Sequence, residues 1–525
     1  MIETGDALRT HAYADFRSHT MIVELTAANP IEVEADVLAM AAGGLGVRKL
    51  DAHFEGRLVR AAATADPVAV VPVTREIRAR SVALVKLEAG EPGDLQLAAA
   101  RAVRAHGVGG TLAWALDETL PIAMYRQVPA VVEGAVLGAY DPGRWKSSAP
   151  KPGVDRFLVC GADEDEERLR DLAKHAELTA RWTNVARELV DGPPNFVTPA
   201  GLAERAAALP GLSVEVIDPT AAGLRALAAV GGASAEAPKL IVVRYEPAGA
   251  PERPLLAFVG KAVTFDAGGY FLKAQSDIVR QKADMAGGAA VLAALGAIAE
   301  LELPLNVIGV VPACENMLGA DAIRPTDVVT TAAGLTVEVT NPDAEGRLIL
   351  ADALWYARRA GATHLIDLAT LTGAMRAGMG DLYGGVFSND KTWSDAVVDA
   401  GNAVGDLAWP WPLHPRYRRL LESRVADLRN TSGRPYGYPI TAAAFLEHFA
   451  GDGPWAHVDM LGPALLDDDR GDAIGAGASG YGVRLLVEIT SRMTAALRRG
   501  AQEAAQEAAA RSMRSFRRKQ ESDDD

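Results

Sequence analysis

Between residues 198 and 495, uninterrupted apolar runs alternate with helical segments, and this alternation constrains the fold more than any other feature of the chain. Strands that are apolar along their whole length are buried on both faces, and helices between them provide the cover. The pattern predicts a mostly parallel sheet whose ligands bind beyond the carboxyl ends of the strands. The predicted strands are 239–245, 255–260, 305–313 and 364–370, and the predicted helices are 287–301 and 347–361.

The first part of the chain repeats this alternation less regularly. A long, charged and helically periodic run over 167–190 follows it, and the prolines of "DGPPNFVTP" end that helix. The predicted elements of the first part are strands over 21–27, 82–87, 111–116 and 156–162 and a helix over 94–107 that ends at Gly107. The predicted domains are an N-terminal α/β domain over 1–165, a connecting helix and linker over 166–197, a larger α/β domain over 198–495, and a polar helical or disordered tail over 496–525.

Composition and charge exclude several classes of protein. The formal net charge is −15, whereas nucleic-acid binding needs clustered Lys and Arg, so we expect no nucleic-acid partner. The two cysteines, Cys160 and Cys314, each lie in an apolar run and are predicted to be buried, which favours a reducing compartment. The N-terminus lacks a basic segment followed by an apolar one, and no run of about 18 apolar residues exists, so we expect neither a signal peptide nor a membrane span.

Polar residues gather where predicted strands end or predicted helices begin. These residues are Lys261, Asp266, Lys273, Asp284, Asp343 and Glu345. Carboxylate oxygens suit hard or borderline divalent cations, and two such cations about 3.5–4 Å apart form a clamp for hydrolysis. Asp343 and Glu345 are two positions apart, so an extended backbone would direct both side chains to the same side. Glycines at 268, 269, 287 and 288 would let the backbone approach the ions.

Each of these residues also has an ordinary structural interpretation. An acid just before a helix, such as Asp284 or Asp343, is more often an N-cap than a metal ligand. A lysine beside acids is usually a surface ion pair, and as an ammonium it cannot ligate a metal. Two neighbouring dications would favour a neutral amine, so Lys261 is a feasible ligand. On spacing alone, both interpretations remain open.

Longer motifs resemble the leucyl aminopeptidase family, the cytosol aminopeptidases of the M17 type. The resemblance is carried by "GKAVTFDAGGYFLKA", "KADMAGGAAV" and "NPDAEGRLILADAL". Further matches follow in the same order as the family's, among them "RPTDVVTTAAGLTVEV", "DLATLTGA", "GRPYGYPITAAAFLEHF" and "WAHVDMLGPA". The similarity covers roughly residues 185–487, which makes it far more specific than one short motif.

The resemblance implies a fold and a reaction. The fold would pair a smaller N-terminal macro-like domain with a larger C-terminal α/β/α catalytic domain around a mostly parallel central sheet. The reaction would release N-terminal amino acids from peptides, with leucine-type or broad specificity, through attack by a metal-activated water. The family's metal ligands match Lys261, Asp266, Asp284, Asp343 and Glu345, its catalytic positions match Lys273 and Arg347, and its substrate-site segment matches Thr370, Leu371, Thr372 and Gly373.

The same resemblance implies cofactors and partners. Each subunit would hold two divalent ions, Mn²⁺ or Zn²⁺ in the first place and Mg²⁺ or Co²⁺ as alternatives, with a bicarbonate at Arg347. The substrates would be peptides, the assembly a homohexamer and the compartment the cytoplasm. Gln281 stands where the family often has a methionine of the substrate side-chain pocket, so a simple leucine preference does not follow. The other departures are Ala262, Ala267, Ala274 and Pro342 in place of Gly, Ser, Pro and Thr.

Two other classes of protein compete with an aminopeptidase. A two-metal phosphoesterase would also use acids but often recruits several histidines, and only His364 and His457 lie near the site segments. A non-catalytic scaffold would be favoured by loss of a metal-ligand position or of Lys273, and all of these positions are filled. The H-E-x-x-H and G-x-S-x-G patterns of zinc proteases and serine hydrolases are absent from the sequence.

Overall fold

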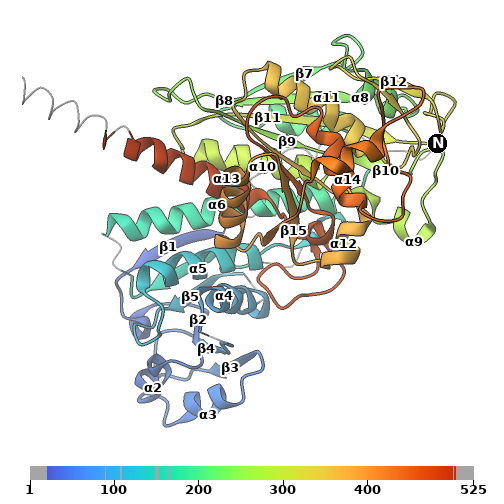
Figure 1. Cartoon of the computed structure of the whole chain (residues 1–525). Helices are drawn as coiled ribbons and strands as arrows, with labels where there is room; N and C mark the ends of the chain where they lie inside the picture. Colours follow the sequence, from blue (N-terminus) through green and yellow to red (C-terminus); the bar gives the residue numbers. More distant parts are fainter. Residues whose placement is uncertain are drawn as a thin grey trace, which may run out of the picture.

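The computed structural model describes residues 21–88, 90–106, 109–147, 153–162, 166–500 and 502–503. Within these residues the chain forms two large sheets, and one long helix, α6 (Glu167–Asp191), lies between them (Figure 1). The N-terminal sheet lies in the blue part of the figure and the C-terminal sheet in the green-to-orange part. Parallel strand pairs and covering helices make up most of both, which confirms the predicted α/β fold class.

The N-terminal sheet is buried on both faces, as its apolar strands require. Its order is β1-β6-β5-β2-β4-β3, and only β3 runs antiparallel to its neighbour. Helices α4 and α5 pack on one face, and α2 and α3 on the other. The elements are β1 (Ile22–Thr26), η1 (Pro30–Glu32), β2 (Val37–Ala41), α2 (Leu45–Asp51), α3 (Arg57–Ala63), β3 (Val68–Pro72), β4 (Ser81–Val85), α4 (Pro92–His106), β5 (Thr111–Ala115), α5 (Met124–Gly138), η2 (Pro142–Trp145) and β6 (Arg156–Cys160).

The C-terminal sheet is parallel at its centre and antiparallel toward its edges. Its order is β16-β15-β18-β14-β9-β11-β8-β7, and β10 pairs with β11. The pairs among β18, β14, β9, β11 and β10 are parallel, whereas β15 opposes β18 and β8 opposes both of its neighbours. The strands are β7 (Ser213–Ile217), β8 (Lys239–Tyr245), β9 (Leu255–Gly260), β10 (Ala262–Asp266), β11 (Asn306–Asn316), β14 (His364–Ala369), β15 (Gly384–Ser388), β16 (Ala408–Pro410) and β18 (Trp455–Asp459).

Helices cover both faces of the C-terminal sheet. Ile241 and Val243 belong to a cluster with α6, α7, α10 and α13, whereas Leu240 and Val242 belong to a cluster with α8, α11 and α14. Alternate residues of one strand point to opposite faces, so the two clusters lie on the two sides of the sheet. The remaining elements are α7 (Pro199–Ala207), α8 (Arg225–Gly231), α9 (Gln275–Ile278), η3 (Gln281–Ala283), α10 (Ala286–Glu300), β12 (Val328–Thr330), β13 (Thr336–Glu338), α11 (Gly346–Arg359), α12 (Gly373–Met379), α13 (Lys391–Ala403), η4 (Pro415–Leu421), β17 (Leu428–Arg429), α14 (Tyr438–Glu447), α15 (Leu461–Ala464), β19 (Leu465–Leu466) and β20 (Gly477–Ala478).

Polar contacts tie α6 to both halves of the molecule. Asp191, the last residue of α6, accepts a hydrogen bond from the Tyr140 hydroxyl (2.8 Å), and its backbone carbonyl accepts one from Lys282 Nζ (2.6 Å). A further contact joins the two halves without involving α6: Arg484 pairs with Asp406 (2.7 Å) and with Glu133 of α5 in the N-terminal half (3.2 Å). Because Lys282 lies two positions before Asp284, the N-terminal half is connected to a loop that carries one of the predicted site residues.

Most predicted elements are present, and the main differences concern short apolar stretches. The predicted strands 239–245 and 255–260 coincide with β8 and β9, but β11 continues to Asn316, beyond the predicted end at 313. β2 is not among the predicted strands, because periodicity cannot distinguish a short apolar run from a buried helix. Gly107 and most of the predicted tail lie outside the described residues, although 483–500 are helical. The domain boundaries remain a proposal.

Two further observations concern burial. Cys160 and Cys314 are buried and free, as predicted. Within the described residues one segment, Gln281–Glu300, is long and apolar enough to cross a membrane, but 89% of it is buried inside the protein. The segment is therefore a core helix, because α10 packs between the C-terminal sheet and α6.

The close contact between α6 and α10 predicts the effect of one small substitution. A Cβ atom added to Gly296 of α10 would lie 2.6 Å from Cζ2 of the buried Trp182 ring of α6. Overpacking of this kind costs about 1–3 kcal/mol and outweighs the gain in helix propensity of about 1 kcal/mol. We expect Gly296→Ala to lower the midpoint of thermal unfolding. Gly93→Ala in α4 is the control, because a Cβ there meets nothing within 4 Å; equal stability of Gly296→Ala and the parent protein would contradict the packing described.

Candidate active site

The predicted site residues lie together at the carboxyl edge of the C-terminal sheet. Lys261 lies between β9 and β10, Asp266 is the last residue of β10, and Thr370 follows β14. Asp284 lies between η3 and α10, and Glu345 directly precedes α11. Loops at this edge of a parallel sheet converge, so residues far apart in sequence meet here.

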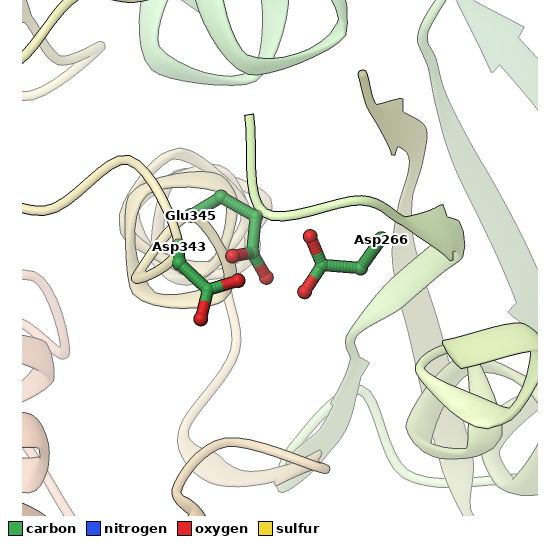
Figure 2. A group of neighbouring side chains, drawn as sticks. All are labelled: Asp266, Asp343 and Glu345. Atoms are coloured by element: carbon green, nitrogen blue, oxygen red, sulfur yellow. The ribbon is translucent and has the colours of Figure 1, made fainter. Parts of the chain in front are cut away.

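Three carboxylates form the centre of the site. The side chains of Asp266, Asp343 and Glu345 each present an oxygen, and these oxygens lie within 4.8 Å of one another. Figure 2 shows the three carboxylates pointing toward a common space. Asp266 and Glu345 are 2% exposed, so their charges are held out of water. A group of this kind has the donor chemistry of a divalent-cation site.

Two lysines reach into the same group. Lys261 Nζ lies 2.8 Å from Asp284 Oδ2 and 2.9 Å from Glu345 Oε1, and it donates to the carbonyl of Thr370 (3.1 Å). Lys273 Nζ lies 2.7 Å from Asp266 Oδ2 and 2.5 Å from Asp343 Oδ1. Asp284 Oδ2 and Asp343 Oδ1 are buried, and the lysine ammoniums are the cationic groups that face them. These oxygens therefore surround a position that favours positive charge.

Burial and mutual repulsion shift the protonation equilibria of these groups. Burial raises the pKa of Asp284 to about 6, and the charge of Lys261 offsets this only in part. Burial also raises the pKa of Asp266, and the charges of Glu345 and Asp284 reinforce it. Burial alone would lower the pKa of Lys261, but Asp284 and Glu345 outweigh it and hold that pKa above its usual value. The site thus stabilises positive charge strongly.

The acids before helices do not act as helix caps. Glu345 occupies the N-cap position of α11 without a side-chain capping bond, and the N-cap of α10 is Met285 rather than Asp284. The hydroxyl of Thr370 instead donates to Asp284 Oδ1 (2.7 Å). The capping interpretation therefore has no support here.

The convergence of Asp343 with Glu345 has a different cause from the predicted one. The backbone is not extended, because 342–343 form a turn and Glu345 has helical φ and ψ angles. The side chain of Asn341 accepts from the Asp343 amide (2.8 Å) and stabilises this turn. Among the glycines, Gly268 (φ +89°) needs its left-handed backbone, and a Cβ there would lie 2.8 Å from Asp343 Oδ1. Gly287 instead lets α10 approach the carbonyl of Leu368, so its role is packing.

Two supporting residues are not among the predicted ones. Asn316 is paired with Asp266 in the β10–β11 register, and its amide donates to Asp266 Oδ1 (2.8 Å) and lies 3.4 Å from Glu345 Oε2. Gly346 leaves room for Lys261, because a Cβ there would lie 2.7 Å from Lys261 Nζ. Asn316 lies beyond residue 313, where the predicted strand ends, so it was not predicted as a strand-end residue. The role of Gly346 depends on its contact with Lys261 in the folded chain, and the sequence does not show that contact.

A cavity of about 540 Å³ opens onto these groups. Among the predicted site residues, its wall includes Lys261, Asp266, Lys273, Gln281, Asp284, Asp343, Glu345, Thr370, Leu371 and Gly373. Arg347 and Thr372 are buried behind the wall. Arg347 Nη1 donates to the carbonyl of Asn430 (2.8 Å), and its guanidinium lies 5.0 Å from the centre of the Tyr438 ring. The Thr372 hydroxyl donates to Asp459 (2.6 Å).

A buried group of acids and lysines at the carboxyl edge of a parallel sheet defines the class of metal-dependent hydrolases. The chain belongs to the cytosol aminopeptidase family: the model of that family's catalytic domain matches residues 184–487. It is accordingly a metallo-aminopeptidase by family.

Individual relatives agree with this assignment. The probable cytosol aminopeptidase of Solibacter usitatus is 42% identical over 425 residues, which cover 80% of this chain and 87% of the relative. That of Geobacter sp. (strain M21) is 37% identical and covers 90% of this chain and all of the relative. Among solved structures, a tomato leucine aminopeptidase variant has a TM-score of 0.81 at 31% identity over 91% of this chain and 97% of its own. The bottromycin maturation enzyme BotP in complex with Mn has a TM-score of 0.77 at 35% identity over 88% of this chain and all of its own.

The contacts of Asn316 predict its effect on the carboxylates. We expect Asn316→Ala to weaken Mn²⁺ binding about 10–100-fold, because groups that orient metal ligands typically contribute that much. Isothermal titration with Mn²⁺ measures it. Asn306→Ala is the matched control: Asn306 begins the same strand, and its side-chain amide donates to the Pro251 carbonyl, outside the site. Unchanged Mn²⁺ affinity in Asn316→Ala would mean that the amide does not orient the two acids.

Proposed function

We propose that this protein is a two-metal aminopeptidase that removes N-terminal residues from peptides. The observation that carries the proposal is the convergence of Asp266, Asp343 and Glu345 inside a cavity large enough for a peptide end. The family assignment supports the release of N-terminal amino acids. The number and identity of the ions and the roles of single residues are the parts proposed here.

The residues present fit a pair of divalent cations. Asp266, Asp343 and Glu345 would reach both ions, and Asp284 and Lys261 would complete one of the two positions. The buried oxygens of Asp284 and Asp343, which already face lysine ammoniums, are consistent with a position that holds positive charge. Lys261 would bind as the neutral amine, because an ammonium has no lone pair. Oxygen-rich donors suit Mn²⁺ and Mg²⁺, and Zn²⁺ or Co²⁺ also tolerate them.

When bound, such cations lower the pKa of a water molecule and polarise the carbonyl that it attacks. The chain's own residues would orient the substrate around this chemistry. Lys273, 14% exposed at its side chain, lies beside Asp266 and Asp343, where its ammonium can donate to the oxyanion of the scissile carbonyl. Thr370, Leu371 and Gly373 would hold the first residue of the peptide along the cavity wall.

The role of Arg347 is proposed from the family and fits its surroundings. Its Nε atom is buried and has no hydrogen-bond partner among the described residues, so it is available to an anion such as bicarbonate. Its Nη1 atom donates to the Asn430 carbonyl, and the guanidinium lies over the Tyr438 ring. These two contacts would hold the guanidinium in one orientation. We propose that Arg347 would hold a bicarbonate here, and such an ion would supply a proton acceptor when bound.

The competing phosphoesterase has less support. Among the described residues no histidine lines the cavity: His457 is fully buried against Asp367 (2.6 Å), and His364 packs on Trp393. The scaffold alternative has less support because none of the proposed metal ligands is replaced and Lys273 lines the same cavity as they do. A homohexamer in the cytoplasm is proposed on the basis of the family alone, and a particle mass of six chains in solution would support the assembly.

The central test removes one carboxylate. We expect Asp343→Asn to reduce hydrolysis of leucine para-nitroanilide with added Mn²⁺ by at least about 100-fold, since groups that merely support a metal ligand already contribute about 10–100-fold. Asp395→Asn, an exposed acid on α13, is the matched control and should retain activity. Chelation with EDTA and dialysis should abolish hydrolysis in the parent protein, and Mn²⁺ or Zn²⁺ should restore it.

Three outcomes would reject this function. One is undiminished hydrolysis by Asp343→Asn in a protein whose circular dichroism matches the parent. The other is hydrolysis that survives complete removal of divalent ions. Failure to cleave any amino acid amide in a panel of N-terminal residues, with each of the four metals supplied, would also reject it.

A further inference from the structure

Two arginines share one carboxylate at an end of the cavity. Arg280 Nη1 pairs with Asp467 Oδ1, and Arg376 Nη2 pairs with Asp467 Oδ2. Arg280 Nη2 also donates to the carbonyl of Leu465 (3.1 Å), which fixes that guanidinium. The two guanidiniums therefore converge from α12 and from the segment before η3 onto a single acid.

This pair belongs to the cavity wall. Arg280 and Arg376 line the same cavity as Asp284 and Thr370, whereas Asp467 is not part of the wall. The side chains of Arg280 and Arg376 are 29% and 33% exposed, so both are reachable from the cavity. Asp277, on the exposed turn of α9, is also part of the cavity wall. Asp467 and Asp277 together balance the charges of the two arginines, so an acidic ligand would bind here by competing with Asp467.

The arginines have capacity for a second acid. A guanidinium carries five N–H donors, and the contacts to Asp467 and Leu465 use only some of them within the described residues. Burial lowers the pKa of Arg280, and the neighbouring charge of Arg376 lowers it further. Asp467 relieves part of that repulsion, and a second negative group beside the two guanidiniums would relieve it further. Gln281, next to Arg280, adds a polar rather than an apolar side chain to the wall.

The position of the pair indicates which part of a peptide it meets, given the proposed function. Lys273 stands beside the scissile carbonyl in that function, at the Asp343 side of the site. Arg376 lies on α12, which begins at Gly373, one of the residues that would hold the first residue of the peptide in that function. Arg280 lines the same cavity and meets Arg376 at Asp467. The pair therefore lies beside the residues proposed to hold the residue that is released.

We propose that Arg280 and Arg376 form a subsite for a carboxylate side chain, and that the enzyme favours peptides whose first residue is acidic. Asp467 competes with that side chain for the two guanidiniums. The subsite sets specificity and takes no part in breaking the bond.

Glutamate and glutamine substrates test this subsite, because they differ in charge and hardly in shape. The ratio of kcat/KM for Glu para-nitroanilide to that for Gln para-nitroanilide, with Mn²⁺ added, is measured in the full chain. We expect a ratio above one in the parent protein. In Arg376→Met the ratio should fall about five- to tenfold, the range expected for one partly exposed charge-assisted contact. In Asp467→Asn it should rise, because the competing carboxylate is gone. Arg359→Met, an exposed arginine on α11 outside the cavity wall, is the matched control and should leave the ratio unchanged.

The outcomes separate this inference from the proposed function. Hydrolysis of both substrates at equal rates, or a ratio that does not change in Arg376→Met, overturns the acidic subsite while leaving the aminopeptidase intact. A ratio that falls in Asp467→Asn also overturns it, because Asp467 would then be part of the recognition. Absence of hydrolysis of Glu, Gln and Leu amides alike would instead reject the aminopeptidase activity itself.

Discussion

Buried negative charge is the constraint on which the rest of this structure depends. Asp266, Asp284 and Glu345 are almost fully buried, and Asp343 is half-buried beside them. Carboxylates brought together out of water repel one another and lose hydration, so they persist only next to compensating positive charge. Lys261 and Lys273 provide part of it, and the proposed cations would provide the rest. The pKa of Asp284 is raised, whereas the pKa of Glu345 is lowered. Burial raises the pKa of each of these two acids, but the charges of the two lysines outweigh burial only at Glu345.

The fold meets this constraint by placing rigid elements directly behind each charged group. Asp266 and Asn316 end neighbouring parallel strands in register, so the backbone that fixes one also fixes its hydrogen-bond donor. Glu345 directly precedes a buried helix, and Thr370 directly follows a central strand and donates a hydrogen bond to Asp284. Sites built on the ends of strands and helices keep their geometry better than sites on loops alone.

Much of this could be predicted from the sequence, and the limits have physical causes. Long apolar strands such as β8 and β9 and the amphipathic α11 are marked by strong patterns, and the acids at their ends are visible as soon as those ends are placed. Asn316 could not be predicted, because an asparagine near a strand end has no periodic pattern. Gly346 could not be predicted either, because its role is to leave space for the Lys261 side chain. The buried side chains of Arg347 and Thr372 bond to Asn430 and Asp459, residues more than 80 positions away. Contacts of that range are not encoded in local spacing.

The chain of contacts from Tyr140 through Asp191 to Lys282 has an evolutionary consequence. It joins the N-terminal half to the segment that carries Arg280, Gln281 and Asp284, and it does so through one side-chain carboxylate and one main-chain carbonyl of the same residue. The two halves are therefore not freely interchangeable modules. A hybrid that combined the first half of one homologue with the second half of another would have to preserve both contacts of Asp191, because they support the segment that lines the cavity.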